Sequence, residues 1–521
     1  MASRNYLIGI GGTGARVIEA VVNLCAAGLG PDELSMFMVD PDAGNGNLDR
    51  TKKLITEYKN SRSKLQKTEG CDLFKTDIKI PPGDKGFVWE IFSNTNATLS
   101  DFINYTNLKN TNPDLSDFAS LLFTHDELSE KLNEGFRGHP SIGSVVMSNP
   151  PQDSYPFKML WEDMNDKKPN DIRVFIVGSV FGGTGAAGFP TLGSKNLIKF
   201  NEKAKIGDES KVLLGGALIL PYFSFETDSS TTEKMFVTSN DFPIATKAAL
   251  QYYNEKDLGF DQIYFIGDSL GQKVGKFGVG SGKQTNFPHY IEMVSSLAAF
   301  DFFEQPPISG VPDKMLFTAT RESDIVKWNQ LPFSRDSLLL KTKQANFKMA
   351  ITNMAVFAYA FSTYGLKILN TPHNDIKDAW YCDHFKFKKN DEKEKVKDPR
   401  NEKIDGLESF LKKFLFWICA MEDESNKVEL IDRTMIVEGN LDAANPTEFK
   451  LTDPESPITR NNIGNILKKD HTKNLDFNSF KTRGLDQVEL RDAKVSEAYS
   501  KLINIFYDGT VRFNKLNYNF N

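Results

Sequence analysis

The stretch that decides the fold is VGSVFGGTGAAG, residues 177–188. An apolar run at residues 174–177 leads into it, and residues 190–200 beyond it have the composition of a helix. The pattern predicts a strand, a glycine turn and the start of a helix. Such a turn lets backbone N–H groups approach an anion, and the helix dipole favours negative charge there. The stretch therefore predicts a phosphate-binding loop, although a turn without a ligand would have the same sequence pattern.

Length and composition describe an ordinary globular protein of two or three domains, with 521 residues, 40% of them hydrophobic and 25% charged. The formal net charge of −6 gives no general attraction to nucleic acid. The four cysteines are widely spaced and form no CxxC pair, which excludes a disulfide framework and a cysteine zinc site. We predict no metal ligand set, no leader peptide and no transmembrane helix, and hence a cytoplasmic protein.

A second glycine turn lies near the N-terminus. Residues 5–10 predict a buried strand, the glycine run GIGGTG occupies residues 9–14, and residues 15–27 have helical periodicity. A second strand at residues 35–39 ends at Asp40 and Asp42. This is a βαβ pattern with an acid that can hydrogen-bond a ribose or lie near a phosphate-bound Mg²⁺. A turn or helix-capping aspartate is the structural alternative.

The remaining N-terminal half alternates strands and helices. Further apolar strands are predicted at residues 212–220 and 261–266, and the pattern predicts an α/β fold with a doubly wound, mostly parallel sheet. Ligands bind at the carboxyl edge of such a sheet. We predict a nucleotide-binding domain over residues 1–285, with residues 51–133 as a polar insertion. Another irregular glycine loop spans residues 135–143.

Two glycine turns in one domain resemble the tubulin and FtsZ superfamily of GTP-binding assembly proteins. FGGTGAA at residues 181–187 is similar to the family loop GGGTG[ST]G, and residues 9–14 resemble its first glycine run. DPDA at 40–43, GHPSIG at 138–143 and PYFSFE at 221–226 resemble the motifs NTDA, GNPxxG and PFxFE. Five loops agree in sequence and order over residues 5–305, so the chain looks like a divergent bacterial tubulin-like protein.

The resemblance implies that the ligand is GTP or GDP, with Mg²⁺ as a candidate companion ion. It also implies head-to-tail self-association into an oligomer or filament through the nucleotide face. Glu226 would contact the ribose, and Asp268 stands where the family often has Asn. Glu292 is a candidate for reading the guanine edge or, alternatively, an exposed first-turn glutamate. The implied nucleotide-binding residues are Gly11, Gly12, Thr13, Gly14, Arg16, Asp40, Asp42, Gly138, Gly182, Gly183, Thr184, Gly185, Glu226, Asp268 and Glu292.

Two departures from the family pattern concern catalysis and the first loop. The family places NxDxx[DE] after its central helix, whereas this chain has QPPISGVPD at residues 305–313. Asp313 is the nearest acid and therefore the catalytic candidate; otherwise the protein binds GTP with little turnover, because phosphoryl transfer depends on positioning. In the first loop Thr13 replaces a glycine, and Arg16 stands where FtsZ commonly has Asn. Arg16 would then contact a phosphate or lie solvated on the helix.

The resemblance also implies how the C-terminal half is organised. Residues 286–305 predict the long central helix, and residues 306–521 predict a smaller mixed α/β domain with a charged loop at 385–403. Residues 342–369 and 407–421 have apolar helical patterns typical of a core. Contacts to unknown protein partners could lie in this part, but no motif marks them.

Three alternatives remain open at this stage. An adenylating enzyme of the ubiquitin-activating type would explain residues 9–14, the acids that follow, and NLDR at residues 47–50. It would not explain the second glycine loop, and no catalytic cysteine is evident. An NAD-dependent oxidoreductase has the same weakness. A non-hydrolysing scaffold with the tubulin-like fold is suggested by the missing NxD pattern.

Overall fold

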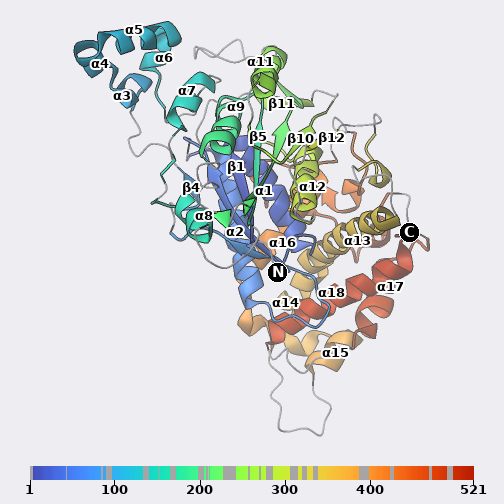
Figure 1. The fold of residues 1–521 in the computed structure, drawn as a ribbon. Helices are drawn as coiled ribbons and strands as arrows, with labels where there is room; N and C mark the ends of the chain where they lie inside the picture. The colour runs from blue at the N-terminus through green and yellow to red at the C-terminus, as the bar shows by residue number, and fades with distance from the viewer. Residues whose placement is uncertain are drawn as a thin grey trace.

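The structure is a computed structural model of the chain (Figure 1). It describes residues 4–42, 44–83, 86–89, 97–132, 136, 140–148, 150–151, 153–164, 172–196, 205–206, 209–210, 212–226, 242–255, 258–268, 272–276, 285–304, 315–319, 325–331, 338–386, 398–422, 427–468, 472–489 and 497–520. All structural statements below concern these residues.

The centre of the fold is an eight-stranded sheet in the order β12-β10-β8-β5-β1-β2-β3, with β4 also paired to β2. All seven strand pairings of this sheet are parallel. From β1 the chain proceeds to β2 and β3 on one side and to β5, β8, β10 and β12 on the other, so the predicted doubly wound parallel sheet is confirmed. The strands are β1 (Arg4–Ile10), β2 (Glu33–Val39), β3 (Asp77–Lys79), β4 (Val88–Trp89), β5 (Ile172–Ser179), β8 (Val212–Ile219), β10 (Gln262–Ile266) and β12 (Met315–Ala319).

Helices cover both faces of the sheet. Neighbouring residues of a strand point to opposite faces, and two adjacent glycines of β8 show which helix lies on each. A Cβ atom on Gly215 would lie 2.6 Å from the ring of Phe302 in α12 (Tyr290–Glu304). A Cβ atom on Gly216 would lie 2.6 Å from the ring of Phe189 in α9 (Gly183–Pro190). Helices α12 and α9 therefore pack on opposite faces, which explains why β8 between them is apolar throughout.

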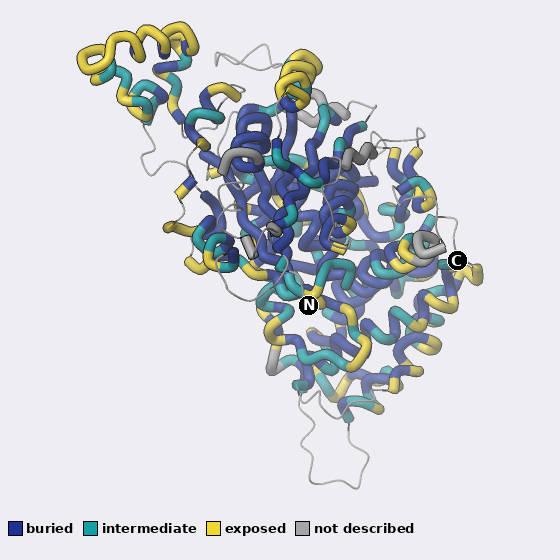
Figure 2. The backbone as a smooth tube through the Cα atoms, in the orientation of Figure 1, coloured by how far each residue is buried: buried dark blue, intermediate teal, exposed yellow. Residues whose placement is uncertain are grey.

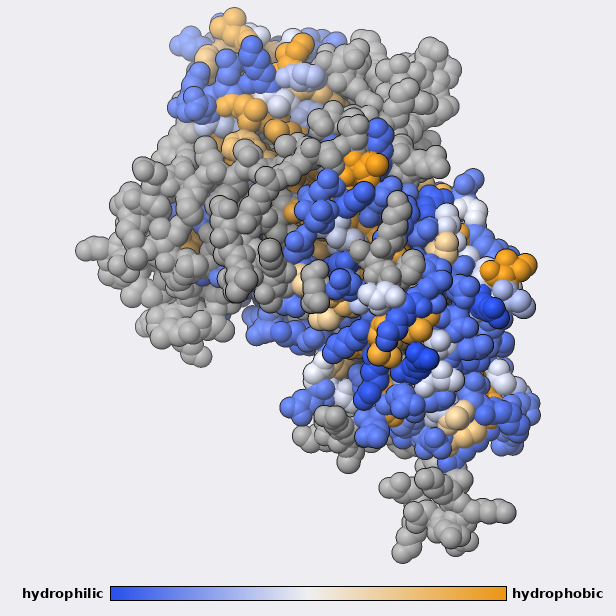
Figure 3. Space-filling view, turned by 90° about the vertical axis from the view of Figure 1, so that its right-hand side faces the viewer, coloured by the Kyte–Doolittle hydropathy of each residue, from blue (hydrophilic) through white to orange (hydrophobic). Residues whose placement is uncertain are grey.

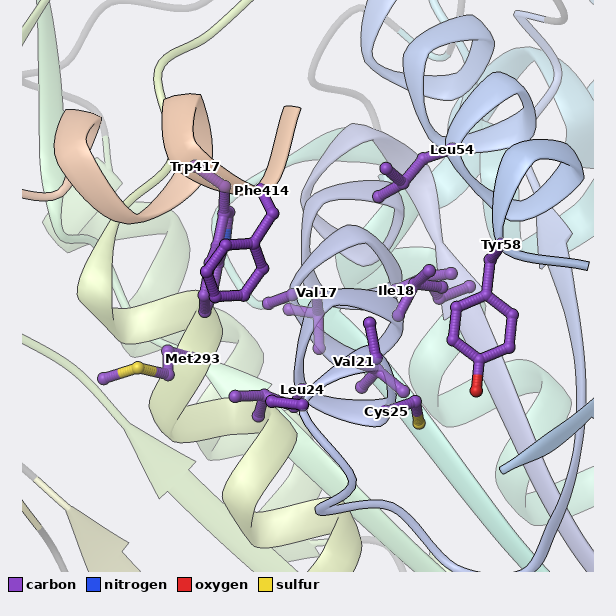
Figure 4. Close-up of a cluster of buried hydrophobic side chains, with 14 of the residues drawn as sticks. Val17, Ile18, Val21, Leu24, Cys25, Leu54, Tyr58, Met293, Phe414 and Trp417 are labelled. Carbon is purple, nitrogen blue, oxygen red and sulfur yellow. The ribbon is translucent and has the colours of Figure 1, made fainter. Parts of the chain in front are cut away.

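Helix α1 (Gly11–Ala26) is buried on all sides, with 14 of its 16 residues enclosed. The sheet covers one side of it, while α2 (Gly46–Lys64), α12 and α16 (Leu407–Ala420) cover the rest. Figure 4 shows the contact: Val17 and Leu24 of α1 face Met293 of α12, and Phe414 and Trp417 of α16 lie over them. The C-terminal part thus completes the core of the N-terminal domain.

The described residues after 325 are mainly helical, unlike the mixed α/β domain predicted for 306–521. The long helices are α13 (Leu338–Ala360), α16 and α18 (Ala498–Asn517), and the strand pairing found there is the short ladder β13–β14 (Val437–Glu438, Lys450–Leu451). Strand β12 follows α12 but pairs with β10, so the predicted domain boundary at 306 does not separate two sheets. Within residues 286–305, predicted as the central helix, α12 forms 15 residues of helix and packs between the sheet and α1.

The segment predicted as an insertion, residues 51–133, is only partly one. Helix α2 and strands β3 and β4 belong to the core, since Leu54 and Tyr58 of α2 are buried and both strands join the main sheet. The true projection is residues 97–132, called the arm below, which stands out at the upper left of Figure 1. The arm consists of α3 (Leu99–Phe102), α4 (Tyr105–Thr111), α5 (Pro113–Leu122) and α6 (His125–Ser129).

The other described elements complete the periphery. They are α7 (Pro140–Val146), α8 (Phe157–Met164), β9 (Phe223–Glu226), α11 (Phe242–Glu255), β11 (Gln272–Lys276), α14 (Leu366–Asn370), α15 (Ala379–Phe385) and α17 (Phe477–Ser479). The face shown in Figure 3 is mainly hydrophilic, with separate small hydrophobic patches. None of the helices in the described part of the chain is long and apolar enough to cross a bilayer.

A core substitution tests whether the C-terminal helices fold as one unit with the sheet. We expect Phe414→Ala to lower the free energy of unfolding by about 3–5 kcal/mol, because Phe414 is fully buried between α16 and α1. Ile458→Ala, at a side chain that is 92% exposed, is the control and should change stability by less than about 0.5 kcal/mol. Urea unfolding followed by tryptophan fluorescence measures both. Two separate transitions, with only the later one shifted, would contradict the shared core.

Candidate functional site

The predicted loops meet at one edge of the sheet. Strands β1, β2, β5, β8 and β10 are parallel neighbours in register, so their carboxyl ends lie together. The pairs that show this are Ile10 with Val39, Gly9 with Val177, Ser179 with Ile219, and Ile219 with Ile266. The glycine turns after β1 and β5, the acids after β2 and the segments after β8 and β10 therefore share this edge, as the sequence predicts.

The two glycine turns touch each other. Gly11 has a positive φ of 69°, and a Cβ atom on it would lie 3.4 Å from the Cβ of Thr184 and 3.9 Å from the backbone N of Gly185. A Cβ atom on Gly185 would lie 2.4 Å from the carbonyl oxygen of Ser179, so only glycine fits there. Both glycine turns form the first turn of a helix. Helix α1 begins at Gly11 and α9 at Gly183, whereas the sequence predicted helices from residues 15 and 190.

The N-termini of α1 and α9 have no side-chain cap. Their N-cap residues are Ile10 and Gly182, and neither accepts a hydrogen bond through a side chain. At α2, by contrast, the Asn45 side chain accepts from the N–H of Asn47. Adjacent helix N-termini with unfilled donors form a site suited to an oxyanion, since their N–H groups and dipoles act on the same point.

Helix α12 is capped by its own residues. The backbone N–H of His289 donates to Glu292 Oε2 at 3.0 Å, and the N–H of Ile291 donates to His289 Nδ1 at 3.2 Å. The two side chains thus fill the donors at the start of the helix. Unlike α1 and α9, this N-terminus has no obvious need for an external acceptor.

Arg16 and Glu292 are joined in a buried polar cluster with Tyr222. Arg16 Nε lies 3.0 Å from Glu292 Oε1, and the Tyr222 hydroxyl accepts from Arg16 and donates to Glu292 Oε1 at 3.0 Å. Burial raises the pKa of Glu292, and the Arg16 charge opposes this rise. Burial alone would lower the pKa of Arg16, but Glu292 and its neighbours raise it. Both side chains therefore serve to hold α1, α12 and the segment after β8 together, and neither is exposed as the solvated alternatives required.

Asp268 lies beside the same cluster. Its Oδ2 is 4.0 Å from His289 Nε2, and both side chains are enclosed, at 0% and 2% exposure. The Tyr222 ring packs on the His289 imidazole with centroids 4.8 Å apart. The residue after β10 thus contacts the beginning of α12, which the sequence alone did not indicate.

Asp40 and Asp42 are both buried at the end of β2. Asp40 Oδ1 accepts from the Asp42 N–H at 3.0 Å, and Asp42 Oδ1 accepts from the Gly44 N–H at 3.1 Å, so both shape the turn as the structural alternative proposed. Burial raises the pKa of Asp40 to about 8; the hydrogen bond from Asp42 lowers it and the Asp42 charge raises it further. In the free protein Asp40 is therefore neutral around pH 7.

Residues at the start of α2 also belong to this edge. A Cβ atom on Gly12 would lie 3.4 Å from Asn45 Nδ2 and 3.8 Å from Asn47 Nδ2. Asn47 exchanges two hydrogen bonds with Asn286, at 2.9 and 3.0 Å, which ties α2 to the segment before α12. No pattern in the sequence indicated the role of Asn45. The proximity of the two asparagines to Gly12 follows only from the packing of α2 against α1.

Arg50, the last residue of the NLDR motif, is engaged within the protein. Its guanidinium binds Glu19 Oε2 at 2.7 Å and donates to the Asn286 carbonyl at 2.9 Å, in a buried setting. This arrangement accounts for the motif as a link between α1, α2 and the segment before α12.

The remaining predicted site residues divide between the two helix starts and parts of the chain outside the described residues. Gly138 and Asp313 lie outside the described residues, and of Glu226 only the backbone, in β9, is described. Thr13, Gly14, Gly182 and Gly183 lie in or directly beside the two helix starts. Among the residues that the structure describes, no group of three acidic, histidine or cysteine side chains forms a metal site.

Comparison with known proteins assigns no family. No protein-family model matches the chain, and no curated protein matches it significantly. The resemblance to the tubulin and FtsZ superfamily therefore rests on the sequences of the five loops.

The buried Asp40 predicts a pH dependence of stability. Because its pKa rises from 3.8 to about 8 on folding, the folded protein binds this proton more tightly than the unfolded chain. As the pH rises from about 4 to about 8, the unfolded chain loses this proton but the folded protein keeps it. The free energy of unfolding therefore falls over this range, by up to about 1.4 kcal/mol per pH unit. Asp40→Asn keeps the acceptor for the Asp42 N–H without the ionisation.

Urea unfolding of both proteins at pH 5 and pH 8 measures this effect. We expect the stability of Asp40→Asn relative to the unchanged protein to be greater at pH 8 than at pH 5. An equal difference at the two pH values would show that Asp40 is ionised in the folded protein.

Proposed function

We propose that this chain is a tubulin/FtsZ-like protein that binds GTP or GDP at the carboxyl edge of its sheet. The observation that carries the proposal is the contact between two glycine-led helix starts, α1 and α9, neither of which has a side-chain cap. Two such N-termini suit a chain of phosphates better than a single anion, because each supplies donors from a different side. The guanine base and the ribose are assigned by the resemblance of the loops.

The phosphates would lie against the backbone N–H groups of residues 11–14 and 182–185. Asp42 is the acid in reach of an Mg²⁺ ion bound to them, whereas Asp40 is neutral in the free protein. Glu226 remains the candidate for the ribose. Arg16 and Glu292 hold the walls of the site in place through their mutual ion pair. The site therefore attracts phosphate mainly through backbone dipoles rather than free cations.

Hydrolysis is the weaker part of the proposal. The family's NxD pattern is absent, and Asp313 is the nearest substitute in the sequence. Phosphoryl transfer relies on exact placement of the attacking water and of charge. We therefore propose nucleotide binding with slow turnover, and a non-hydrolysing scaffold is the limiting case. Equilibrium binding and GTP turnover, measured separately, distinguish the two.

A charge placed at the start of α1 tests the phosphate site. We expect Gly12→Asp to weaken GTP binding by about 100-fold, since a carboxylate there would occupy and repel the phosphate position. Gly12→Asn, of the same size without the charge, is the matched control and should lose much less affinity. The Gly12 backbone has no positive φ, and a Cβ there would lie at ordinary contact distances from the Asn45 and Asn47 amides, 3.4 and 3.8 Å. Both variants should therefore fold.

Titration calorimetry with GTP, GDP, ATP and NAD measures these affinities. The proposal expects GTP and GDP to bind in preference to ATP and NAD. Tight binding of ATP alone, or equal GTP binding by Gly12→Asp and Gly12→Asn, would refute it. Gly185→Ala is not a suitable probe, because its Cβ would collide with the Ser179 carbonyl and disturb the fold.

Head-to-tail association through the nucleotide face predicts a dependence on the nucleotide. We expect light scattering of the full chain to rise with GTP and to rise less with GDP, and Gly12→Asp to abolish the difference. Scattering that is the same with GTP, with GDP and without nucleotide would favour the scaffold over the assembling protein.

A further inference from the structure

Exposed apolar side chains are concentrated on two elements of the described surface. Twelve large hydrophobic side chains of the described residues are exposed, and seven of them lie on the arm or on α11. Figure 2 shows both elements as mainly exposed, at the same end of the molecule. Such a concentration marks an interaction surface, whereas single exposed apolar residues are ordinary.

The arm presents an apolar and acidic surface. Its exposed apolar residues have exposures between 45% and 83%; they are Phe102, Leu115, Phe118, Leu121 and Leu122. In α5 only Ser116 and Ala119 are buried, so the larger side chains face outward. Residues 97–132 contain six acidic and two lysine side chains, a net charge of −4. A complementary surface must therefore be apolar and carry positive charge.

The groove beside α11 has these properties. It has a volume of about 650 Å³ and lies between the segment after β8 and one side of α11. Its apolar wall consists of Leu220, Pro221, Pro243 and Leu250. Lys247 is the one charged residue among those that line it. Ile244 and Tyr252, at 72% and 46% exposure, extend the apolar surface of the same helix.

We propose that the arm of one copy of this chain occupies the α11 groove of a second copy. The arm is a projecting apolar element and the groove an apolar hollow, and the acidic arm complements Lys247. Within one molecule α5 and α11 lie apart (Figure 1), so the contact forms between copies. In a two-fold dimer each arm fills the groove of the other subunit, and both apolar surfaces are covered at once.

This dimer is a contact in addition to head-to-tail association, and it does not rest on the proposed nucleotide. Pro221, a wall of the groove, is also the first residue of the PYFSFE loop at the candidate nucleotide site. The two modes of association therefore use neighbouring surfaces. We expect them to compete.

Analytical ultracentrifugation of the full chain without nucleotide tests the dimer. We expect the unchanged protein to dimerise, and Leu121→Glu and Lys247→Glu each to weaken dimerisation by about tenfold or more. Both side chains are exposed, so neither substitution threatens the fold. Ile458→Glu, on an exposed residue elsewhere, is the control and should dimerise like the unchanged protein.

A variant that keeps the charge gives the matched control. Lys247→Arg retains the positive charge beside the groove and should dimerise like the unchanged protein, whereas Lys247→Glu should not. A monomeric unchanged protein, full dimerisation of Lys247→Glu, or equal weakening by Lys247→Arg and Lys247→Glu would overturn the proposal. GTP affinity measured on the same samples separates this test from that of the proposed function, because the two outcomes are independent.

Discussion

The parallel pairing of β1 with β5 is the constraint on which the rest of the structure depends. It aligns Gly9 with Val177 and so places two strand–glycine–helix units side by side. At the spacing of neighbouring strands, about 4.8 Å, the two turns lie next to each other. Gly11, whose φ of 69° favours glycine, lies beside Thr184 of the other turn. Because α1 then begins inside the sheet edge and is buried on all sides, it must be covered by further helices, which α2, α12 and α16 supply.

Buried ion pairs join these covering helices to α1. Arg16 with Glu292 and Arg50 with Glu19 link α1 to α12 and α2, with all four side chains enclosed. Such pairs add little net stability, because desolvation offsets their attraction, but breaking one leaves a costly buried charge. Their effect is to hold one arrangement of the helices. They also leave the glycine turns with backbone donors as their main attraction for an anion.

The two ends of the molecule differ in how far their helices are buried. The C-terminal helices bury the outer side of α1, α2 and α12, so that this half of the chain belongs to the same core as the sheet (Figure 4). The arm and α11 remain exposed at the opposite end (Figure 2). The proposed contact between copies therefore lies at the end of the molecule opposite the C-terminal helices.

The sequence by itself indicated a parallel sheet, five of its eight strands (β1, β2, β5, β8 and β10) and the loops that follow them. These depend on local patterns: apolar runs of strand length, glycine turns, and acids at strand ends. Only the tertiary structure decided that β12 returns to the first sheet and that α2 is core, because pairing partners are distant in sequence. It likewise turned Arg16, Arg50 and Glu292 from candidate ligand contacts into internal ion pairs. A charged residue near a loop has the same sequence pattern in either role, and only the partner that folding places beside it distinguishes them.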